Sequence, residues 1–496
     1  MNDANYRRAI LRITTGDREK LESLIFSRYP YREWGTFFRF GYRITSWGML
    51  VTYVAPMPPG PGELNRGSSI VEFDPRYILR AQLGLPGNPL GIGVIHSHPQ
   101  GCGTFASSLD NDMDGYFSRE FALYGSGRPY ISLRMAKTEA GSFAFSGEAW
   151  VNGECMPFTE LLTTGPVLYR ERAEVCRPAN LDLANTDPKS NARARELLGD
   201  DKVNRIQAAV VAIVGCSGTG SPAAHVLARA GVGYFVLVDP QPFERSNHER
   251  FHASTWADLS EHQPKVELIR RLILSINPSA KVTSIRGNVL DEAVLDELLK
   301  CDLVLGCTDT QHSRAALSDY ATLYLLPCID SAVLMRAKDG RITEQVGEFA
   351  RYSSDEPCAW CLGRINQNAL SYELMPEQER KARQAAAAEA TGRGLDGQQY
   401  WGGEPPKELT VGYMTSTVGA MQAGYAHCWL TGSAQMPHQR FQFDLGMPLL
   451  GVVPVEKQRR PECCCHRTKG YSDQGRADRS ITRPDHWLER VTAPSA

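Results

Sequence analysis

The first third of the chain alternates short apolar runs with polar breaks, in a pattern that predicts strands joined by a few helices. Apolar runs over Trp34–Tyr42 and Gly91–Ile95 have the length and composition of strands. Apolar residues at helical spacing predict helices over Asp17–Phe26 and Asp112–Leu123. The proline- and glycine-rich run at residues 56–62 predicts a loop. We treat this region as one folded unit.

A different pattern follows, in which apolar strands alternate with amphipathic helices. Short apolar runs at Ala208–Val214, Tyr234–Asp239 and Leu303–Gly306 predict strands, and the segments between them have helical spacing. This alternation is typical of an α/β fold, with a mainly parallel sheet covered on both faces. The chain is therefore predicted to contain one unit over 1–165, a connector over 166–190, an α/β unit over 191–470 and a loose polar tail over 471–496.

Composition places the chain among soluble globular proteins. Its 496 residues exceed the size at which single cores stop growing, so two or three domains are expected. The formal charge of −2 gives no basic field that would favour nucleic acid. No apolar run approaches the roughly 20 residues of a membrane span, and the polar start Met1-Asn2-Asp3 lacks a signal-peptide core. We therefore expect a cytoplasmic protein that binds neither nucleic acid nor membrane.

Two histidines at the end of a predicted strand indicate a metal site. Residues i and i+2 of a strand face the same side, so His96 and His98 can both point at one ion while Ser97 faces away. Asp110 can supply a third, anionic ligand. Three protein ligands and a water are typical of catalytic zinc rather than structural zinc. Such an ion lowers the pKa of its water toward ~7.

The sequence around these residues resembles the JAMM/MPN (JAB) metalloprotease family, which cleaves peptide or isopeptide bonds after ubiquitin-like proteins. The resemblance rests on His96-Ser97-His98-Pro99 followed by Ser107-Ser108-Leu109-Asp110, and it covers about residues 15–150. It implies an α+β domain in which His96, His98 and Asp110 bind zinc. Ser107 would support the oxyanion. The gap between His98 and Ser107 is one residue longer than is usual in the family.

The family also needs a glutamate as general base, on the strand after the first helix. Glu33 matches that position best and would take the proton of the water. Glu72 is the competitor, in the turn-like Glu72-Phe73-Asp74-Pro75. Asp112 could replace Asp110 as a ligand if the loop is shifted.

A glycine-rich loop indicates a nucleotide site in the second unit. The run GCSGTGS at residues 215–221 follows an apolar strand and opens a helix. Its backbone amides and the positive helix end can face a phosphate, so Gly215, Gly218 and Gly220 are expected to bind nucleotide. Asp239 closes the next strand, where a carboxylate can hold ribose hydroxyls. These features alone would also fit an NAD-dependent enzyme.

The residues after Asp239 resemble the signature of ThiF/E1-type adenylating enzymes. That signature is carried by Asn247, Arg250, Lys265 and Asp309, in this order, and the resemblance covers about residues 190–470. It implies a Rossmann-like domain that binds ATP and Mg²⁺, with Asp239 on the ribose and Asp309 on the metal. The other three residues would contact the phosphates, because attack of a carboxylate on the α-phosphorus needs cations nearby.

Two further positions bear on this resemblance. Arg193 or Arg195 would be the family arginine that reaches the ATP of a partner subunit, which implies a homodimer through the adenylating domain. Phe251 stands where the family usually has a glutamine after Arg250, so one expected polar contact is missing.

Cysteines near the end of the second unit indicate a structural zinc site. Without a secretion signal, reduced thiols and metal ligands are expected rather than disulfides. Cys358 and Cys361 form half of a tetrahedral site. The resemblance implies that the other half lies in Cys463-Cys464-Cys465-His466. By the family's register, Cys463 and His466 are the ligands, and Cys465 is the alternative to His466.

Ubiquitin-activating members of the family also form a thioester, through a cysteine in the segment after the first cysteine pair. No cysteine occurs from Leu362 to His427. Cys428 follows in an apolar helical stretch, where burial would raise the pKa of a thiol and limit its access. The sequence therefore predicts that this chain forms no thioester and needs a second protein that bears the nucleophile.

These motifs together predict a bifunctional enzyme of a bacterial-type ubiquitin-like system. The first domain would trim or release the C-terminus of a ubiquitin-like or sulfur-carrier protein that ends in glycine. The second domain would adenylate the exposed carboxylate and pass it to an E2-like or other nucleophile-bearing partner. The alternatives are a peptide-modifying adenylase of the ThiF family and a regulatory protein that binds ubiquitin-like proteins through decayed sites.

Overall fold

A computed structural model describes most of the chain, namely residues 7–66, 71–85, 87–125, 127–138, 143–174, 188–260, 262–394, 409–436, 438–446, 452–479 and 481. The chain divides into two compact units. Unit 1 contains Met1–Asp182, Thr322–Leu326 and Cys464–Asp478, and unit 2 contains Leu183–Ala321, Pro327–Cys463 and Arg479–Ala496. Among the described residues, no helix is long and apolar enough to cross a membrane.

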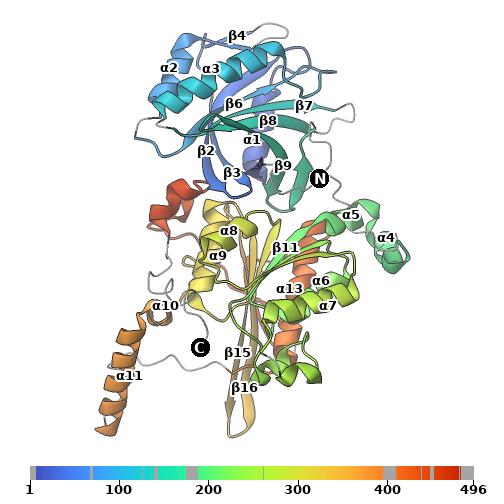
Figure 1. Ribbon diagram of the computed structural model, residues 1–496, viewed down its shortest axis with the longest axis vertical. Coiled ribbons are helices and arrows are strands. Elements are labelled where there is room, and N and C mark those ends of the chain that lie inside the picture. The colour runs from blue at the N-terminus through green and yellow to red at the C-terminus, as the bar shows by residue number, and fades with distance from the viewer. Residues whose placement is uncertain are drawn as a thin grey trace. The chain divides into compact units, whose positions relative to one another are not determined.

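Unit 1 is built on a seven-stranded barrel (Figure 1). The strand order is β1-β3-β2-β6-β7-β8-β9, and β9 pairs again with β1 to close the sheet, while β10 pairs with β9. The strands of the barrel sheet are β1 (Arg8–Thr14), β2 (Trp34–Thr45), β3 (Gly48–Met57), β6 (Gly91–Ser97), β7 (Tyr130–Lys137), β8 (Phe143–Val151), β9 (Glu154–Thr164) and β10 (Tyr169–Arg172). A separate two-stranded sheet pairs β4 (Leu64–Arg66) with β5 (Val71–Phe73).

Among the described residues of unit 1, three α-helices pack around this sheet, namely α1 (Thr15–Ile25), α2 (Pro75–Leu83) and α3 (Ser108–Tyr124). Helix α3 turns Phe117 and Phe121 inward, where both rings meet Phe37 of β2 edge to face. The predicted helices are therefore present, but α3 begins at Ser108, before the predicted start at Asp112. The earlier start places Asp110 in the first turn of the helix.

The beginning of the predicted tail is held within unit 1. Ser472 is fully buried, and its hydroxyl lies 2.8 Å from the hydroxyl of Thr52 on β3. Asp473 pairs with Arg43 of β2 at 3.2 Å. The expectation of a loose segment from residue 471 onward is therefore wrong for its first residues, because they supply polar partners to the barrel strands. The rest of that tail, from 482, and residues 175–187 of the predicted connector lie outside the described residues.

Unit 2 contains an eight-stranded sheet in the order β13-β12-β11-β14-β15-β16-β17-β18. Neighbours from β13 to β15 are parallel and those from β15 to β18 are antiparallel. The strands are β11 (Val210–Val214), β12 (Tyr234–Val238), β13 (Lys281–Ile285), β14 (Leu303–Gly306), β15 (Cys328–Lys338), β16 (Arg341–Tyr352), β17 (Arg440–Asp444) and β18 (Val452–Pro454). The mainly parallel sheet confirms the predicted α/β class for this unit.

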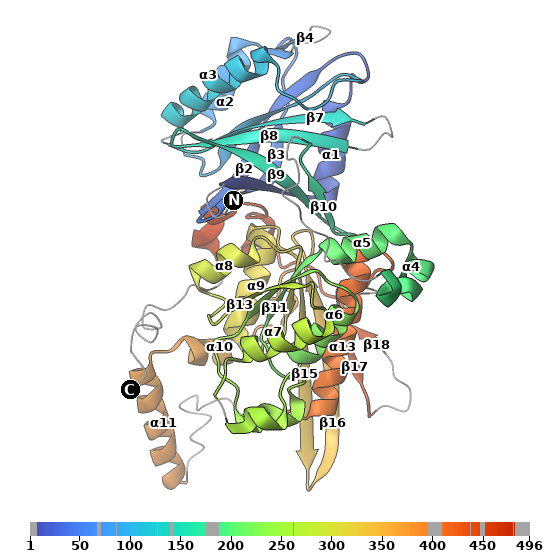
Figure 2. The same ribbon diagram turned by 45° about the vertical axis from the view of Figure 1, so that its right-hand side comes forward.

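Helices cover both faces of the sheet of unit 2. The described helices of this unit are α4 (Ala192–Leu198), α5 (Asp200–Ala208), α6 (Gly220–Arg229), α7 (Lys265–Ile276), α8 (Glu292–Leu298), α9 (Gln311–Leu323), α10 (Gln367–Leu374), α11 (Glu377–Gly392) and α13 (Gly412–Thr431). Helices α6, α7 and α13 lie on one face, and α8 and α9 lie on the other (Figures 1 and 2). With both faces covered, β11 and β12 are nearly continuous apolar runs rather than alternating ones.

Candidate functional sites

The first candidate site lies in unit 1, where β6 ends. His96 belongs to the end of β6 and His98 follows it, and the Nε2 atoms of the two rings are 3.2 Å apart. Asp110 reaches both rings, with Oδ1 3.2 Å from Nε2 of His96 and Oδ2 3.9 Å from Nε2 of His98. The three ligand atoms lie within 4.8 Å of one another. Two imidazoles and a carboxylate at this spacing suit a zinc ion with an open fourth position.

The loop after His98 orients its ring. Nδ1 of His98 lies 2.6 Å from the carbonyl oxygen of Gly103, so Nδ1 carries the hydrogen and Nε2 is left to face a metal. Burial, and then the nearby His96, lower the pKa of His98. A lowered pKa favours the neutral imidazole, which is the form that binds metals.

A buried arginine holds the same loop from the neighbouring strand. Arg134 of β7 is in register with His96 and its side chain is almost fully buried. Nε of Arg134 donates to the carbonyl of Thr104 at 3.2 Å. The N–H and the hydroxyl of Thr104 donate to Glu174 at 2.9 and 2.6 Å. Sequence reasoning missed these residues, because none of them belongs to a local motif and they come together only in the fold.

Asp110 is held by a capping box at the start of α3. The N–H and hydroxyl of Ser107 donate to Oδ2 of Asp110 at 2.7 and 2.8 Å, and the N–H of Asp110 donates to the hydroxyl of Ser107 at 3.1 Å. Burial acts to raise the pKa of Asp110, but the interactions with His96 and Ser107 hold that pKa below its usual range. Ser107 therefore orients the carboxylate. Asp112 is exposed and lies outside the ligand cluster.

A pocket of about 230 Å³ opens over the cluster, and Glu33 lines it. Burial raises the pKa of Glu33, which makes its carboxylate a stronger base. The competing Glu72 is exposed, while its neighbours Val71 and Phe73 line the pocket. Neighbouring residues of a strand face opposite sides, so Glu72 of β5 points away. Of the two glutamates, the structure brings Glu33 to the cluster.

The second candidate site lies at the carboxyl ends of three adjacent strands of unit 2. Gly215 follows β11, Asp239 follows β12, and Asp309 lies in the loop after β14. Strand β11 lies between β12 and β14, so the chain leaves β11 in one direction and returns on its other side. In open α/β sheets such a switch point forms the crevice in which ligands bind.

The glycine loop approaches the sheet too closely for side chains. Gly215 has a φ of +96°, and a Cβ there would lie 2.5 Å from the carbonyl oxygen of Cys307. A Cβ on Gly220 would lie 2.1 Å from the carbonyl oxygen of Gly215. At Gly218 a Cβ would lie 3.2 Å from Thr415. Helix α6 can therefore begin directly against the end of β11, with its backbone amides at the crevice.

Asp239 and Lys265 lie together beside this loop. Asp239 accepts hydrogen bonds from the N–H groups of Cys216 and Gln241, both at 2.8 Å. Lys265, at the start of α7, is buried, and its Nζ donates to Oε1 of Gln241 at 2.8 Å. Burial raises the pKa of Asp239, and the charge of Lys265 opposes this shift.

Asn247 and Arg250 belong to a 3₁₀ turn, η3 (Arg245–Arg250). Asn247 is buried, and its Oδ1 accepts from the N–H of Glu244 at 3.1 Å. Nη1 of Arg250 donates to the hydroxyl of Thr410 at 2.8 Å, a contact that no motif marks. Phe251, at the position of the family glutamine, is buried, so it serves packing instead.

The two candidate arginines of α4 differ in their surroundings. Arg195 donates from Nε to Oδ1 of Asn191 at 2.9 Å and pairs with Asp200 at 2.6 Å. Arg193 is exposed to solvent. The guanidinium of Arg195 is thus engaged within its own unit.

Comparison with known proteins identifies this second part of the chain. The family model described as the ThiF family matches residues 190–465, which is more than half of the chain. The chain belongs to the ThiF family. The match begins at residue 190, so the histidine cluster lies outside it.

The ThiF-family part is similar to several adenylating enzymes. It is 36% identical over 163 residues to the molybdopterin-synthase adenylyltransferase of Escherichia coli (strain K12), covering 32% of this chain and 61% of that protein. It is 30% identical to the sulfur carrier protein ThiS adenylyltransferase of the same organism, covering 28% of this chain and 57% of that protein. It is 28% identical to the SAMP-activating enzyme E1 of Haloferax volcanii, covering 37% of this chain and 64% of that protein. The chain thus spans about three fifths of the length of these relatives.

Solved structures show a likeness to this chain as well. A crystal structure of E. coli MccB with MccA-N7isoASN covers 57% of this chain and 76% of the other, with 16% identity and a TM-score of 0.43.

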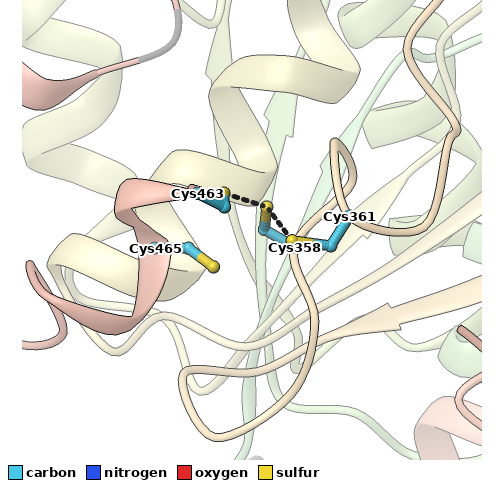
Figure 3. A group of neighbouring side chains, drawn as sticks. All are labelled: Cys358, Cys361, Cys463 and Cys465. Atoms are coloured by element: carbon cyan, nitrogen blue, oxygen red, sulfur yellow. Dashed lines mark hydrogen bonds between the residues drawn. The ribbon is translucent and has the colours of Figure 1, made fainter. Parts of the chain in front are cut away.

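Four cysteines gather within the ThiF-family part (Figure 3). The Sγ atom of Cys358 lies 3.7 Å from that of Cys361 and 3.5 Å from that of Cys463. With Cys465 included, the four sulfur atoms lie within 4.8 Å of one another. Four thiolates about 2.3 Å from one zinc ion would be about 3.8 Å apart at the corners of a tetrahedron. The cluster fits a structural zinc.

The fourth ligand position differs from the prediction. Cys465 is buried and belongs to the cluster, whereas the predicted ligand His466 is exposed. Both lie in the short 3₁₀ turn η5 (Cys464–His466), where three residues make one turn and adjacent side chains point about 120° apart. Only one of these neighbours can face the cluster, and it is Cys465, the alternative.

Proposed function

We propose that the ThiF-family unit is an E1-like adenylyltransferase that activates the C-terminal carboxylate of a ubiquitin-like or sulfur-carrier protein. The observation that carries this proposal is the meeting of Gly215, Asp239 and Asp309 at one end of adjacent parallel strands, inside the matched region. The names of the relatives support it, because they are adenylyltransferases of molybdopterin synthase and of the carrier ThiS and an activating enzyme of SAMP.

In the proposed reaction, an oxygen of the acceptor's terminal carboxylate attacks the α-phosphorus of ATP. A bond forms between that oxygen and the phosphorus, the bond to the oxygen that bridges to the β-phosphate breaks, and pyrophosphate leaves with the electron pair. Both reactants are anions, so positive charge must stand near the phosphates. Arg250 and Lys265 would supply it, together with Asn247 and the amides at the start of α6.

The carboxylates would serve the ribose and the metal. Each oxygen of Asp239 accepts one backbone hydrogen bond and can accept another, which leaves room for ribose hydroxyls. Asp309 would hold Mg²⁺, whose charge would offset that of the pyrophosphate. The carboxylate of Asp309 is exposed and lies near enough to Asp239 for its negative charge to raise the pKa of Asp239. Carboxylate oxygens are the ligands that Mg²⁺ prefers.

We further propose that unit 1 is a zinc-dependent peptidase or isopeptidase that processes or releases the same carrier protein. His96, His98 and Asp110 would hold the zinc, which would supply a Lewis acid and an activated water. Glu33 would take a proton from that water and pass it to the leaving amine. Ser107 would contribute by fixing Asp110, to which its N–H and its hydroxyl both donate. To support the oxyanion, its hydroxyl would turn from Asp110 to the substrate.

The activated carboxylate would pass directly to a second protein rather than to a cysteine of this chain. The absence of cysteine from Leu362 to His427 supports this, and it equally suits a peptide-modifying adenylase. Cys428 lies on α13 and is half-buried. In a homodimer through the ThiF-family unit, the exposed Arg193 would be the residue that reaches the partner's ATP.

Exchange of labelled pyrophosphate into ATP tests the adenylation step. Exchange should require Mg²⁺ and the acceptor, and Asp309→Ala should abolish it. A short peptide that supports exchange where a carrier protein ending in glycine does not would favour the peptide-modifying alternative. Exchange that persists in D309A would contradict the assignment of Asp309, and oxidation of NADH would contradict adenylation altogether.

A further inference from the structure

A carboxylate from a distant segment holds the helix that follows Asp309. Glu373 lies near the end of α10, and its Oε1 accepts a hydrogen bond from the N–H of Gln311 at 2.8 Å. Its Oε2 accepts from the N–H of His312 at 2.9 Å and lies 2.8 Å from Nδ1 of the same histidine. One carboxylate thus binds two backbone N–H groups and one imidazole in the first turn of α9.

The other end of α10 contacts the same place. The N–H of Asn366 donates to Oε1 of Gln311 at 3.0 Å. Asn366 is also the N-cap of α10, with its side chain accepting from the N–H groups of Asn368 and Ala369. Both ends of α10 therefore bind the start of α9.

Helix α10 is itself anchored to the sheet. Arg364, just before α10, has an almost fully buried side chain. It donates to Asp330 of β15 at 2.7 Å and pairs with Glu348 of β16. Three residues earlier, Cys361 belongs to the cysteine cluster. The segment that supports Gln311 and His312 is therefore itself tied to the sheet and to the cysteine cluster.

We propose that Glu373 is a positioning residue for the Mg²⁺ and ATP site, an inference that rests on the proposed adenylation function. Asp309 is exposed and lies in a short loop between β14 and α9, so its position depends on how firmly the two flanks are held. On the strand side, the N–H of Cys307 donates to the carbonyl of Val214 at 2.8 Å. On the helix side, the hydroxyl of Thr310 donates to Ser313 at 2.7 Å, and Glu373 holds the next two residues, Gln311 and His312. A metal ligand on such a loop loses affinity when its support loosens.

The charge of Glu373 is essential to this role. The first N–H groups of a helix carry partial positive charge and favour a carboxylate. Glutamine has the same shape but only one acceptor oxygen, and its NH₂ group would face a second donor. Glu373→Gln should therefore release one of the two backbone N–H groups while it keeps the packing.

The test is nucleotide binding, which needs no acceptor protein. Binding of a fluorescent ATP analogue is measured in excess EDTA and across a Mg²⁺ titration, for the full chain and its variants. E373Q should weaken the apparent Mg²⁺ affinity roughly tenfold and leave binding in EDTA unchanged. Glu373→Asp, which keeps the charge, should lie between E373Q and the wild type. His312→Gln keeps both backbone contacts of Glu373 and should weaken the apparent Mg²⁺ affinity about threefold.

Glu377→Gln is the matched control, because Glu377 is exposed at the start of α11 and pairs with Lys381 of the same helix. It should behave as the wild type. An E373Q chain with wild-type Mg²⁺ dependence would overturn this inference but not the proposed function. The same holds if E373Q loses equal ATP affinity with and without Mg²⁺, because that result indicates a general structural effect. If E373Q does not fold, E373D and H312Q with wild-type Mg²⁺ dependence would overturn it. A wild-type chain without Mg²⁺-dependent ATP binding would overturn the proposed function and the inference with it.

Discussion

The cysteine cluster can be tested by setting Cys465 against its neighbour. The family register favours His466, whereas the sulfur of Cys465 lies with the other three thiols. Cys465→Ser removes one sulfur ligand and nearly preserves the side-chain volume, and His466→Ala removes an exposed ring. If zinc is bound by four thiolates, only C465S should weaken its binding. Cys464→Ser is the matched control, since Cys464 is adjacent but outside the cluster.

The size of the effect follows from the number of ligands. Structural zinc contributes about 10–16 kcal/mol of apparent binding free energy in zinc-finger peptides. Shared evenly among four ligands, one thiolate corresponds to about 2.5–4 kcal/mol, or roughly a hundredfold to a thousandfold in zinc affinity. Because metal affinity in such sites is folding free energy, the same loss should lower the unfolding temperature of a unit of this size by about 4–7 °C.

The assay must separate this zinc from any ion at the histidine cluster. All variants are therefore made in a chain that also carries His96→Ala and His98→Ala. Zinc per chain is measured by mass spectrometry after dialysis, zinc affinity by competition with a chelator, and stability by thermal unfolding. C465S should lose zinc to the competitor, while H466A and C464S keep about one zinc per chain. A chain that loses zinc in H466A but not in C465S would refute the reasoning.

Three further outcomes are expected. Gly220→Ala should destabilise the chain by about 1–3 kcal/mol and weaken ATP binding, because the new Cβ would lie 2.1 Å from a carbonyl oxygen. The control is Gly424→Ala on α13, where a Cβ would meet no atom within 4 Å. This variant should slightly raise the stability of the chain in thermal unfolding. Glu33→Gln should retain zinc in metal analysis but cleave a carrier-protein fusion at least about 100-fold more slowly, and a normal rate would remove Glu33 as the base. Incubation with ATP and the acceptor should give no thiol-sensitive adduct on a non-reducing gel, and an adduct mapped to any cysteine of this chain would show that a thioester forms.

Much of the architecture and chemistry could be predicted because it depends on local spacing. His96 and His98 face one side because alternate residues of a strand do so, whatever the rest of the fold. The apolar runs of β11, β12 and β14 are short and lie between amphipathic helices, as is typical of strands in a parallel sheet whose two faces are both covered. The order of glycines and charged residues after them predicted a nucleotide site, and Gly215, Asp239 and Asp309 lie at the carboxyl ends of these strands.

Choices between alternatives required the fold. Glu33 reaches the pocket because β2 pairs with β6 in a register that sets Trp34 opposite Ser97. Cys465 and His466 are equally good ligands by type, and the direction of one 3₁₀ turn decides between them. Arg193 and Arg195 differ because Arg195 pairs with Asp200 and donates to Asn191, whereas Arg193 is exposed.

What the sequence determined by itself is therefore which side of each element a residue faces and which chemistry that side carries. What only the tertiary structure decided is which elements meet, as where Ser472 contacts Thr52 of β3 or Glu373 contacts the first turn of α9. The physical reason is that local orientation follows from the backbone geometry of a few neighbouring residues. Contacts between distant segments depend instead on strand register and on packing, to which many residues each contribute a small energy.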